Sequence, residues 1–194
     1  MKHPSTRELF DYWNNRRGSR PAPERSEIEP GAIRRVLADT FILGIDPGSG
    51  HPFRIAGTRV CAIFGRELKG MAFTDLWRET SRSAIREILA VVATESVGVV
   101  AGASAHGGEG ALLKLEFLAL PLRQRDGTNA RILGALTSAE NPYWLGTGAL
   151  GPLTLGTSRY LGAETRATAT SPAPVTAVSG RVRHGLVVYD GGHA

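Results

Sequence analysis

The sequence is poor in cysteine and has no long apolar run. Its 194 residues include a single cysteine, Cys61, so an internal disulfide is excluded and a reducing compartment is favoured. The longest apolar run, 112–122, is interrupted by Lys114 and Glu116, so we expect no membrane span. The N-terminus also lacks the apolar core of a signal peptide. Together these absences predict a cytoplasmic protein.

Patterns typical of catalysis or of metal binding are missing as well. The five histidines lie apart from one another and from any Cys, Asp or Glu at metal-ligand spacing, so no metal site is predicted. The nucleophile-elbow pattern G-x-S-x-G does not occur. A G-x-G-x-x-G match at 146–151 is followed at once by Pro152, and no amphipathic helix that could meet a pyrophosphate comes after it. The sequence therefore predicts neither an enzyme nor a metal centre.

Lysine is scarce, although the chain is basic. Lys and Arg together number 23 against 18 Asp and Glu, which gives a net charge of +5, and nearly all the cations are arginines. The densest cluster contains Arg16, Arg17, Arg20 and Arg25, but no aromatic residues interleave it as they would on a base-stacking surface. A nucleic-acid-binding regulator would rest on net charge alone, so we do not expect a nucleic-acid partner.

Residues 39–77 carry the pattern around which the chain is organised. Phe41, Leu43 and Ile45 alternate with their neighbours, and a tight turn at 46–50 leads into a second alternating stretch that contains Phe53 and Ile55. This period of two predicts a hairpin. Short helical segments broken by glycine are expected to follow.

A long helix and three strands are predicted after this hairpin. The helix covers 79–94, and its apolar residues recur at helical spacing, so one face should lie on a sheet. Strands are expected at 97–105, from 113 to Pro121, and at 131–138. The apolar residues of the helix are Ile85, Ile88, Leu89 and Val92.

The N-terminal segment predicts a short amphipathic helix. Ser5 and Glu8 have the spacing of a capping box, and the helix should end near Gly18. A proline-rich linker and a short helix over 29–37 are expected next. Four large apolar residues within five positions predict a homodimer through this helix, with packing on the chain's own sheet as the alternative. These residues are Leu9, Phe10, Tyr12 and Trp13.

The C-terminal part has a different composition. Residues 161–180 are rich in Ala, Thr, Ser and Pro, which predicts a flexible segment, and 182–189 reads as a detached strand. We therefore divide the chain into an N-terminal helix and linker (1–30), a core (31–145) and a C-terminal extension (146–194).

The run FRIAGTRVCAIFGRELKGMAFTDLW (53–77) resembles the signature of stand-alone PAS-domain proteins of proteobacteria. The resemblance continues through LEFLALPLR (115–123), RILGAL (131–136) and PYWLG (142–146). It implies an α+β fold, a five-stranded antiparallel sheet with helices on one face, to which this chain adds an N-terminal helix and a C-terminal tail.

The resemblance also implies where a ligand would bind. PAS domains bind small molecules between the inner face of the sheet and the short helices, although side chains in such patterns are more often ordinary core. Trp77 and Arg59 carry an N–H and a guanidinium that could orient a ligand. The candidate lining is Phe53, Ile55, Arg59, Cys61, Phe64, Phe73, Trp77, Ile85, Leu89, Leu115, Phe117 and Leu133.

No cofactor is predicted for this cavity. The helical stretches between 58 and 94 contain no histidine of the kind that holds haem in some PAS domains. Cys61 lies roughly where photosensory PAS domains carry a flavin-reactive cysteine, but the Asn-Cys-Arg-Phe-Leu-Gln motif of those domains is absent. A packed apolar cysteine is the better interpretation.

Two functional hypotheses follow. The first is a bacterial, cytoplasmic sensory module without an output domain, which acts through contact with a partner protein and is gated by a small apolar ligand. The alternative is a cone of the nuclear-transport-factor type that binds or transforms a small hydrophobic molecule. The second would need a polar cavity with paired acid and base residues, whereas the inward positions are nearly all apolar.

Overall fold

The computed structural model describes residues 1–107, 110–124, 129–140, 149–161, 181–183 and 186–188. The chain divides into two compact units, Met1–Gly162 and Ala163–Ala194. The first unit contains the sheet and the helices discussed below. No helix in the described residues is both long enough and apolar enough to cross a membrane.

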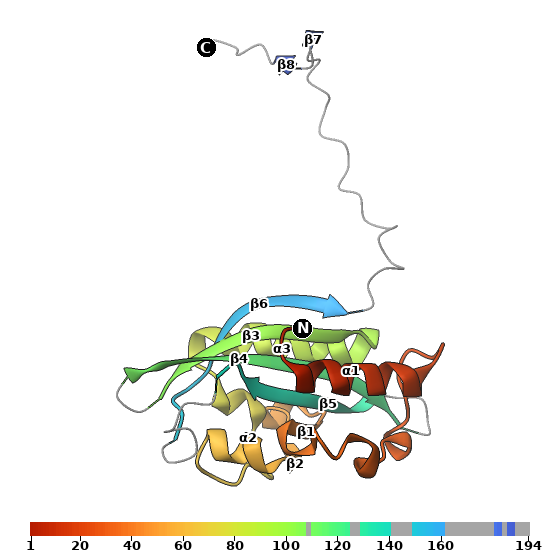
Figure 1. Ribbon diagram of the computed structural model, residues 1–194, viewed down its shortest axis with the longest axis vertical. Helices are drawn as coiled ribbons and strands as arrows, with labels where there is room; N and C mark the ends of the chain where they lie inside the picture. The colour runs from red at the N-terminus through yellow and green to blue at the C-terminus, as the bar shows by residue number, and fades with distance from the viewer. Residues whose placement is uncertain (108–109, 125–128, 141–148, 162–180, 184–185, 189–194) are drawn as a thin grey trace. The chain divides into compact units, whose positions relative to one another are not determined.

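The first unit is built on one antiparallel sheet in the order β2-β1-β5-β4-β3-β6 (Figure 1). The long central strands pair over many residues. The expected α+β fold with an antiparallel sheet is confirmed. The strands are β1 (Thr40–Gly44), β2 (Phe53–Ala56), β3 (Gly98–His106), β4 (Leu112–Arg123), β5 (Asn129–Ser138) and β6 (Thr154–Leu161).

One side of the sheet, here called the inner face, is covered by short helices and by α3. These are α2 (Thr58–Ile63), the 3-10 helix η5 (Phe73–Leu76) and α3 (Glu79–Glu95). The helix predicted at 79–94 is therefore present. Its apolar residues Ile85, Ile88, Leu89 and Val92 are buried in the main core, as their spacing predicts.

The opposite side, the outer face, carries α1 (Pro4–Arg17), which lies across the sheet in front of β4 and β5 (Figure 1). The helix ends at Gly18 with a positive φ of 57°, near the predicted position. The expected capping box is wrong. The cap is His3, whose Nδ1 accepts a hydrogen bond from Ser5 N, and Pro4 occupies the first turn, where its missing N–H costs nothing.

Four short 3-10 helices lie between α1 and β2 in the sequence, three of them before β1 and one after it. They are η1 (Arg25–Glu27), η2 (Pro30–Ile33), η3 (Leu37–Asp39) and η4 (Pro47–Ser49). The single helix expected over 29–37 is thus two shorter pieces that bury Ile33 and Val36 beneath α1. The tight turn expected at 46–50 is confirmed, because Asp46 caps η4 and Gly50 has a left-handed conformation.

The sheet has six strands, not the five that were expected. The extra strand, β6, pairs with β3 and falls in the part of the chain that was assigned to the C-terminal extension. Most of its residues are exposed. Leu161, the first residue of the segment that was expected to be flexible, belongs to this strand, and the rest of that segment (162–180) lies outside the described residues.

In the second unit, β7 (Arg181–Arg183) and β8 (Leu186–Val188) pair antiparallel. The single detached strand predicted for 182–189 is therefore a hairpin of two very short strands. In a two-stranded pair, each strand forms backbone hydrogen bonds along one edge, and its other edge is left open.

Candidate functional site

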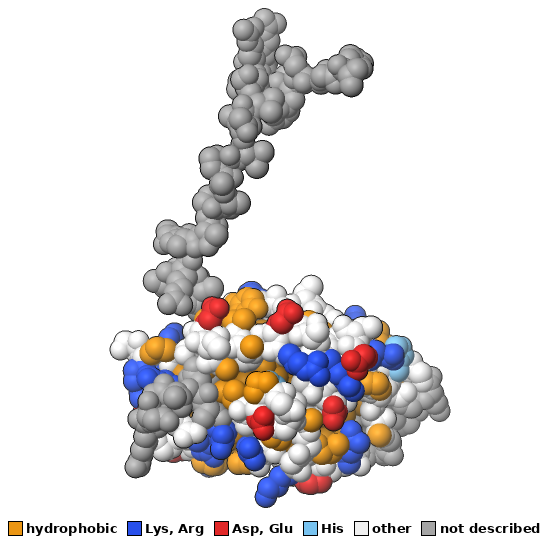
Figure 2. Space-filling view, turned by 180° about the vertical axis from the view of Figure 1, so that it is seen from behind, with side chains coloured by type: hydrophobic (Ala, Val, Ile, Leu, Met, Phe, Trp, Pro, Cys, Tyr) orange, Lys and Arg blue, Asp and Glu red, His pale blue; other side chains and the backbone are white. Residues whose placement is uncertain are grey.

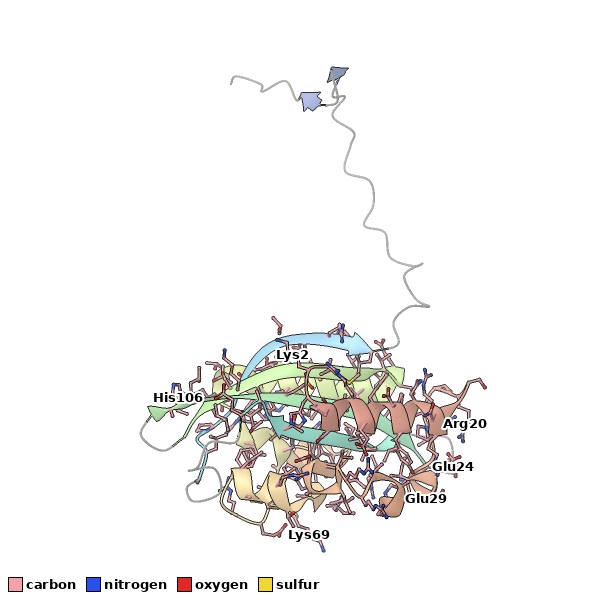
Figure 3. All side chains as sticks on the ribbon, in the orientation of Figure 1. Lys2, Arg20, Glu24, Glu29, Lys69 and His106 are labelled. Atoms are coloured by element: carbon pink, nitrogen blue, oxygen red, sulfur yellow. The ribbon has the colours of Figure 1, made fainter. Side chains whose placement is uncertain are left out.

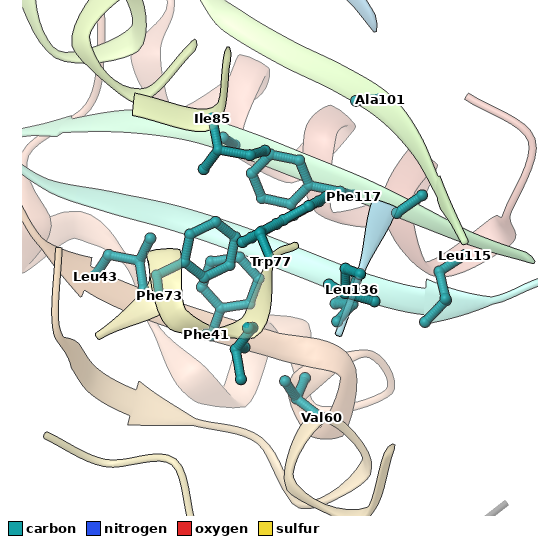
Figure 4. Packing of buried hydrophobic residues seen from close by; sticks show 14 of the residues in the cluster. Phe41, Leu43, Val60, Phe73, Trp77, Ile85, Ala101, Leu115, Phe117 and Leu136 are labelled. Carbon is teal, nitrogen blue, oxygen red and sulfur yellow. The ribbon is translucent and has the colours of Figure 1, made fainter. Parts of the chain in front are cut away.

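Five aromatic rings meet between the inner face of the sheet and the short helices (Figure 4). Phe73 is the hub: its ring centroid lies 5.5 Å from Phe41, 5.6 Å from Phe53, 5.3 Å from Phe117 and 5.8 Å from Trp77. Several pairs meet edge to face, a geometry that the quadrupoles of aromatic rings favour. All five side chains are fully buried.

Trp77 is the only member of this cluster whose side chain has a hydrogen-bond donor. The side chain is completely buried, and Nε1 has no acceptor among the described residues. Its ring lies 5.8 Å from Phe117, which approaches edge-on. A buried N–H is nearly always bonded in native proteins, because leaving it unpaired costs about 1–3 kcal/mol. This indole is therefore the chemical feature that most distinguishes the site from plain core.

The structure brings together most of the residues proposed from sequence to line the cavity. Eight of them belong to the main core, and Cys61 packs against it while partly exposed. They lie between the sheet and the helices, and their role as the lining of a ligand cavity stays a prediction. The eight are Phe53, Phe64, Phe73, Trp77, Ile85, Leu89, Leu115 and Phe117.

Two proposed lining residues lie on the outer face, and the proposal is wrong for them. Ile55 is 48% exposed because a bulge places Arg54 as an extra residue between Phe53 and Ile55, so these two side chains point to opposite faces. Leu133 pairs with Ile42 and Leu120 in the core beneath α1.

Arg59 also lies away from the aromatic cluster. Its Nε and Nη2 donate to the two carboxylate oxygens of Asp39, at 2.6 and 2.9 Å, and the side chain is more than half exposed. The hydrogen bond that Arg59 donates to Asp39 is the main cause that raises the pKa of Arg59. Asp39 immediately precedes β1, so this bidentate pair ties α2 to the start of the sheet. The guanidinium that was expected to orient a ligand is a structural link.

Phe41 and Leu43 belong to the site although they were not among the candidate lining residues. Both are buried in the main core, and Phe41 stacks on Phe117 at 6.2 Å with an angle of 6° between the rings. The alternation of apolar residues in β1 pointed to this face. Gly134, on the neighbouring strand, makes room for the Phe41 ring, because a Cβ there would lie 2.2 Å from it.

Cys61 has the character of a packed thiol. Its Sγ donates to Glu67 Oε1 at 3.5 Å, and burial is the main cause that raises the pKa of the thiol. A raised pKa keeps the group protonated at neutral pH, which lowers its reactivity. Within the described residues there is no cluster of three or more His, Cys, Asp or Glu side chains that could hold a metal ion.

The candidate dimer residues of α1 face their own sheet. Leu9 and Trp13 are buried against β4 and β5, and Trp13 Nε1 donates to Pro121 O at 2.8 Å. Phe10 and Tyr12 pack beside them and stay partly exposed. This is the fold-back alternative considered from sequence. The homodimer itself stays a prediction, and it would need a surface other than Leu9 and Trp13.

The basic residues do not form a single footprint on the side opposite α1. Figure 2 shows Lys and Arg side chains scattered there among acidic and apolar ones. Around α1, Arg16 and Arg20 pair with Glu29 and Glu27. The cluster of arginines singled out in the sequence is thus partly neutralised.

A family model described as "PAS domain" matches residues 1–137. The chain belongs to the PAS-domain family. It follows that the protein is a sensory or signalling module, which PAS domains generally are, and the nuclear-transport-factor-like alternative is set aside.

Solved structures with low similarity are PAS and light-oxygen-voltage domains. An RNA-binding light-oxygen-voltage receptor is 18% identical with a TM-score of 0.43, over 61% of this chain and 34% of its own length. The light state of the blue-light photoreceptor Aureochrome1 LOV is 15% identical with a TM-score of 0.43, over 58% and 89%. A sensory box sensor histidine kinase from Vibrio cholerae is 9% identical with a TM-score of 0.39, over 57% and 90%.

The chain thus spans about a third of the length of the first of these proteins. No curated protein matches the chain significantly. The family assignment rests on the family match.

Proposed function

We propose that this PAS module holds a small, largely apolar molecule against its aromatic cluster and passes the occupied state on through contact with a partner protein. The observation that supports this best is the unpaired indole N–H of Trp77. A buried donor surrounded by aromatic rings offers a place for one acceptor atom within an apolar environment. The ligand we propose is therefore apolar with a single carbonyl, ether or similar oxygen.

The backbone around Trp77 links this position to the edge of the sheet. The backbone of Trp77 forms an isolated parallel β-bridge with Leu153, in which Arg78 N donates a hydrogen bond to Leu153 O at 2.8 Å. Two residues later, Leu155 N in β6 donates to Ser81 Oγ at 3.1 Å. A shift of the Trp77 ring would thus be carried directly to the start of β6.

The partner surface that we propose is β6. One edge of this strand pairs with β3, and β6 is the last strand of the sheet on that side. Six of its eight residues are exposed, and the other two are half-buried. An open strand edge can accept an extended segment of another chain. We infer that the partner contact forms there and responds to what occupies the site beside Trp77.

Native mass spectrometry of the full chain, gently purified, tests the ligand. We expect a non-covalent adduct that is lost on denaturation. Trp77→Phe retains most of the aromatic surface but removes the donor, so the adduct should be strongly reduced. Trp13→Phe is the matched control, because its indole bonds to Pro121 O on the other face and the adduct should persist. An adduct-free wild type, or equal adducts in both variants, contradicts the proposal.

A further inference from the structure

The outer face of the sheet is only half covered. Leu118, Leu120 and Leu122 of β4 pack beneath α1 in the second core. Further along the sheet, the outward positions of β3 are Val100, Gly102 and Ser104, because Ala101 and Ala103 face the main core. A helix thus covers one half of the face, and the other half has small and polar residues.

A groove of about 860 Å³ lies over this uncovered half. Its floor is β3, its sides are β4 and β6, and the N-terminal arm (Met1–Pro4) forms one wall. Figure 1 shows the N-terminus in front of β3 and close to β6. Pockets that hold small organic molecules have volumes of roughly 300–1,000 Å³, so this groove is large enough for one.

The arm is held in place by Glu116 of β4. One carboxylate oxygen accepts from Lys2 N at 2.6 Å, and the other accepts from His3 N at 3.0 Å and from the Thr6 hydroxyl. Burial acts to raise the pKa of Glu116, but these hydrogen bonds together lower it, so the group stays ionised. The carboxylate oxygens are therefore already engaged with the arm, and the wall of the groove is fixed.

Three cations line the groove, and none has an ion-pair partner among the described residues. They are Lys2 of the arm, Lys114 of β4 and Arg159 of β6. Glu116 is the single acidic side chain in the lining, so positive charge exceeds negative. Figure 3 shows Lys2 at the sheet edge near β6, far from Lys69.

The cations are spread along the groove over a floor made of Val100, Gly102 and Ser104. Lys114 pairs in register with Ser104, and Arg159 pairs with Val100, so they lie four positions apart along β3, about 13 Å. Between them, Gly102 leaves open space: a Cβ there would meet only Thr157 O, at 3.9 Å. Met1 and Pro4 of the arm and Ala139 add apolar residues to the lining, and Val100, which is only 7% exposed, lies at one end of the floor.

We propose that this groove binds an amphipathic organic anion, whose apolar body lies over Val100 and Gly102 and whose carboxylate or phosphate group meets Lys114 or Arg159. Cations that have no ion-pair partner among the described residues, beside a lining that includes Met1, Pro4 and Ala139, provide both parts of this recognition. The site is on the opposite face of the sheet from Trp77, so it is independent of the ligand proposed for the core.

Titration of the isotope-labelled full chain by NMR tests this, with octanoate and octyl phosphate as the two anionic probes and octan-1-ol as the uncharged control. We expect both anions to shift the amides of Gly102 and Ser104, and octan-1-ol to leave them unchanged. A tighter constant for one anion identifies the preferred head group. Lys114→Gln combined with Arg159→Gln should weaken binding about tenfold.

Two further variants isolate the groove. Gly102→Leu should fill the floor and abolish binding of both anions, and it needs no positive φ. Arg66→Gln combined with Lys69→Gln removes the same charge elsewhere on the surface and should leave binding unchanged. Equal binding of octan-1-ol, an unchanged constant in the double groove variant, or shifts confined to the residues around Trp77 would overturn the proposal. The last result would still support a core ligand.

Discussion

The two faces of the sheet treat buried polar groups differently. On the outer face, the indole of Trp13 bonds to Pro121 O, and the Thr6 hydroxyl bonds to His3 O and Glu116. On the inner side, Trp77 Nε1 and His51 Nδ1 are buried without any partner in the described residues. An unpaired buried polar group lowers the free energy of unfolding by about 1–3 kcal/mol. The inner side therefore carries a destabilisation that the paired groups of the outer face do not.

This difference in hydrogen bonding distinguishes Trp13, whose contact is structural, from Trp77, which is a candidate functional residue. A tryptophan that only fills space is best placed where its N–H is bonded, as Trp13 is. Trp77 lacks such a bond among the described residues, although its ring lies edge to face with Phe73 and Phe117. Departures from complete hydrogen bonding tend to occur at functional sites. Substitutions that remove the indole N–H but keep an aromatic ring can therefore test the comparison between Trp13 and Trp77.

Removal of the whole Trp77 side chain should have the largest effect. The ring is fully buried and touches Phe73 and Phe117, so Trp77→Ala should lower the free energy of unfolding by about 3–5 kcal/mol. Urea denaturation followed by circular dichroism measures this. A variant that unfolds like wild type but no longer retains a bound molecule would show that Trp77 serves the ligand and not the core.

The helices and most strands could be predicted because their apolar residues recur with a single period. In α3, Ile85, Ile88 and Leu89 have polar neighbours, so only one orientation buries them. In β4, Lys114 and Glu116 alternate with apolar residues and mark the outer side. The sixth strand was missed because Gly156 and the proline before it resemble a loop, and because an edge strand has few buried residues to reveal its period.

The candidate site was predicted less completely, for two physical reasons. Leu133 could not be assigned to a face from sequence, since β5 is apolar on both sides and α1 supplies the second cover. Ile55 was misplaced because no local pattern reveals the bulge at Arg54, which reverses the alternation. The pairing of Arg59 with Asp39 joins residues twenty positions apart, and sequence spacing does not predict such a contact.

A pair of conservative variants tests the comparison between the two tryptophans, and the expected effect on the free energy of unfolding is smaller. Trp13→Phe and Trp77→Phe remove similar volume from two buried sites, but only the first breaks a hydrogen bond, which leaves Pro121 O unpaired. Trp13→Phe should therefore cost about 1–2 kcal/mol more than Trp77→Phe. Unfolding midpoints in urea, measured side by side, check the order. Equal costs would show that the indole of Trp77 is bonded in solution.

The smallest expected effect concerns His51, the other unpaired group of the inner side. The residue is buried at the end of the turn before β2, with a φ of 59°, and Phe73 N donates to its carbonyl at 3.3 Å. Burial is the largest cause that lowers its pKa from 6.5, and Arg86 acts in the same direction, whereas a hydrogen bond with Gly44 and the charge of Asp46 oppose it.

Because the folded protein resists protonation of His51, the unfolded chain takes up the proton first as the pH falls. The stability associated with this group is therefore complete above pH 6.5 and decreases below it, with a slope of at most about 1.4 kcal/mol per pH unit for one proton. His51→Asn tolerates the left-handed conformation and does not titrate. Unfolding free energies measured across this range should decrease in wild type and stay flatter in the variant. Parallel curves would mean that the ring of His51 has an acceptor or water partner that stabilises its charged form, and the two faces would then differ at Trp77 alone.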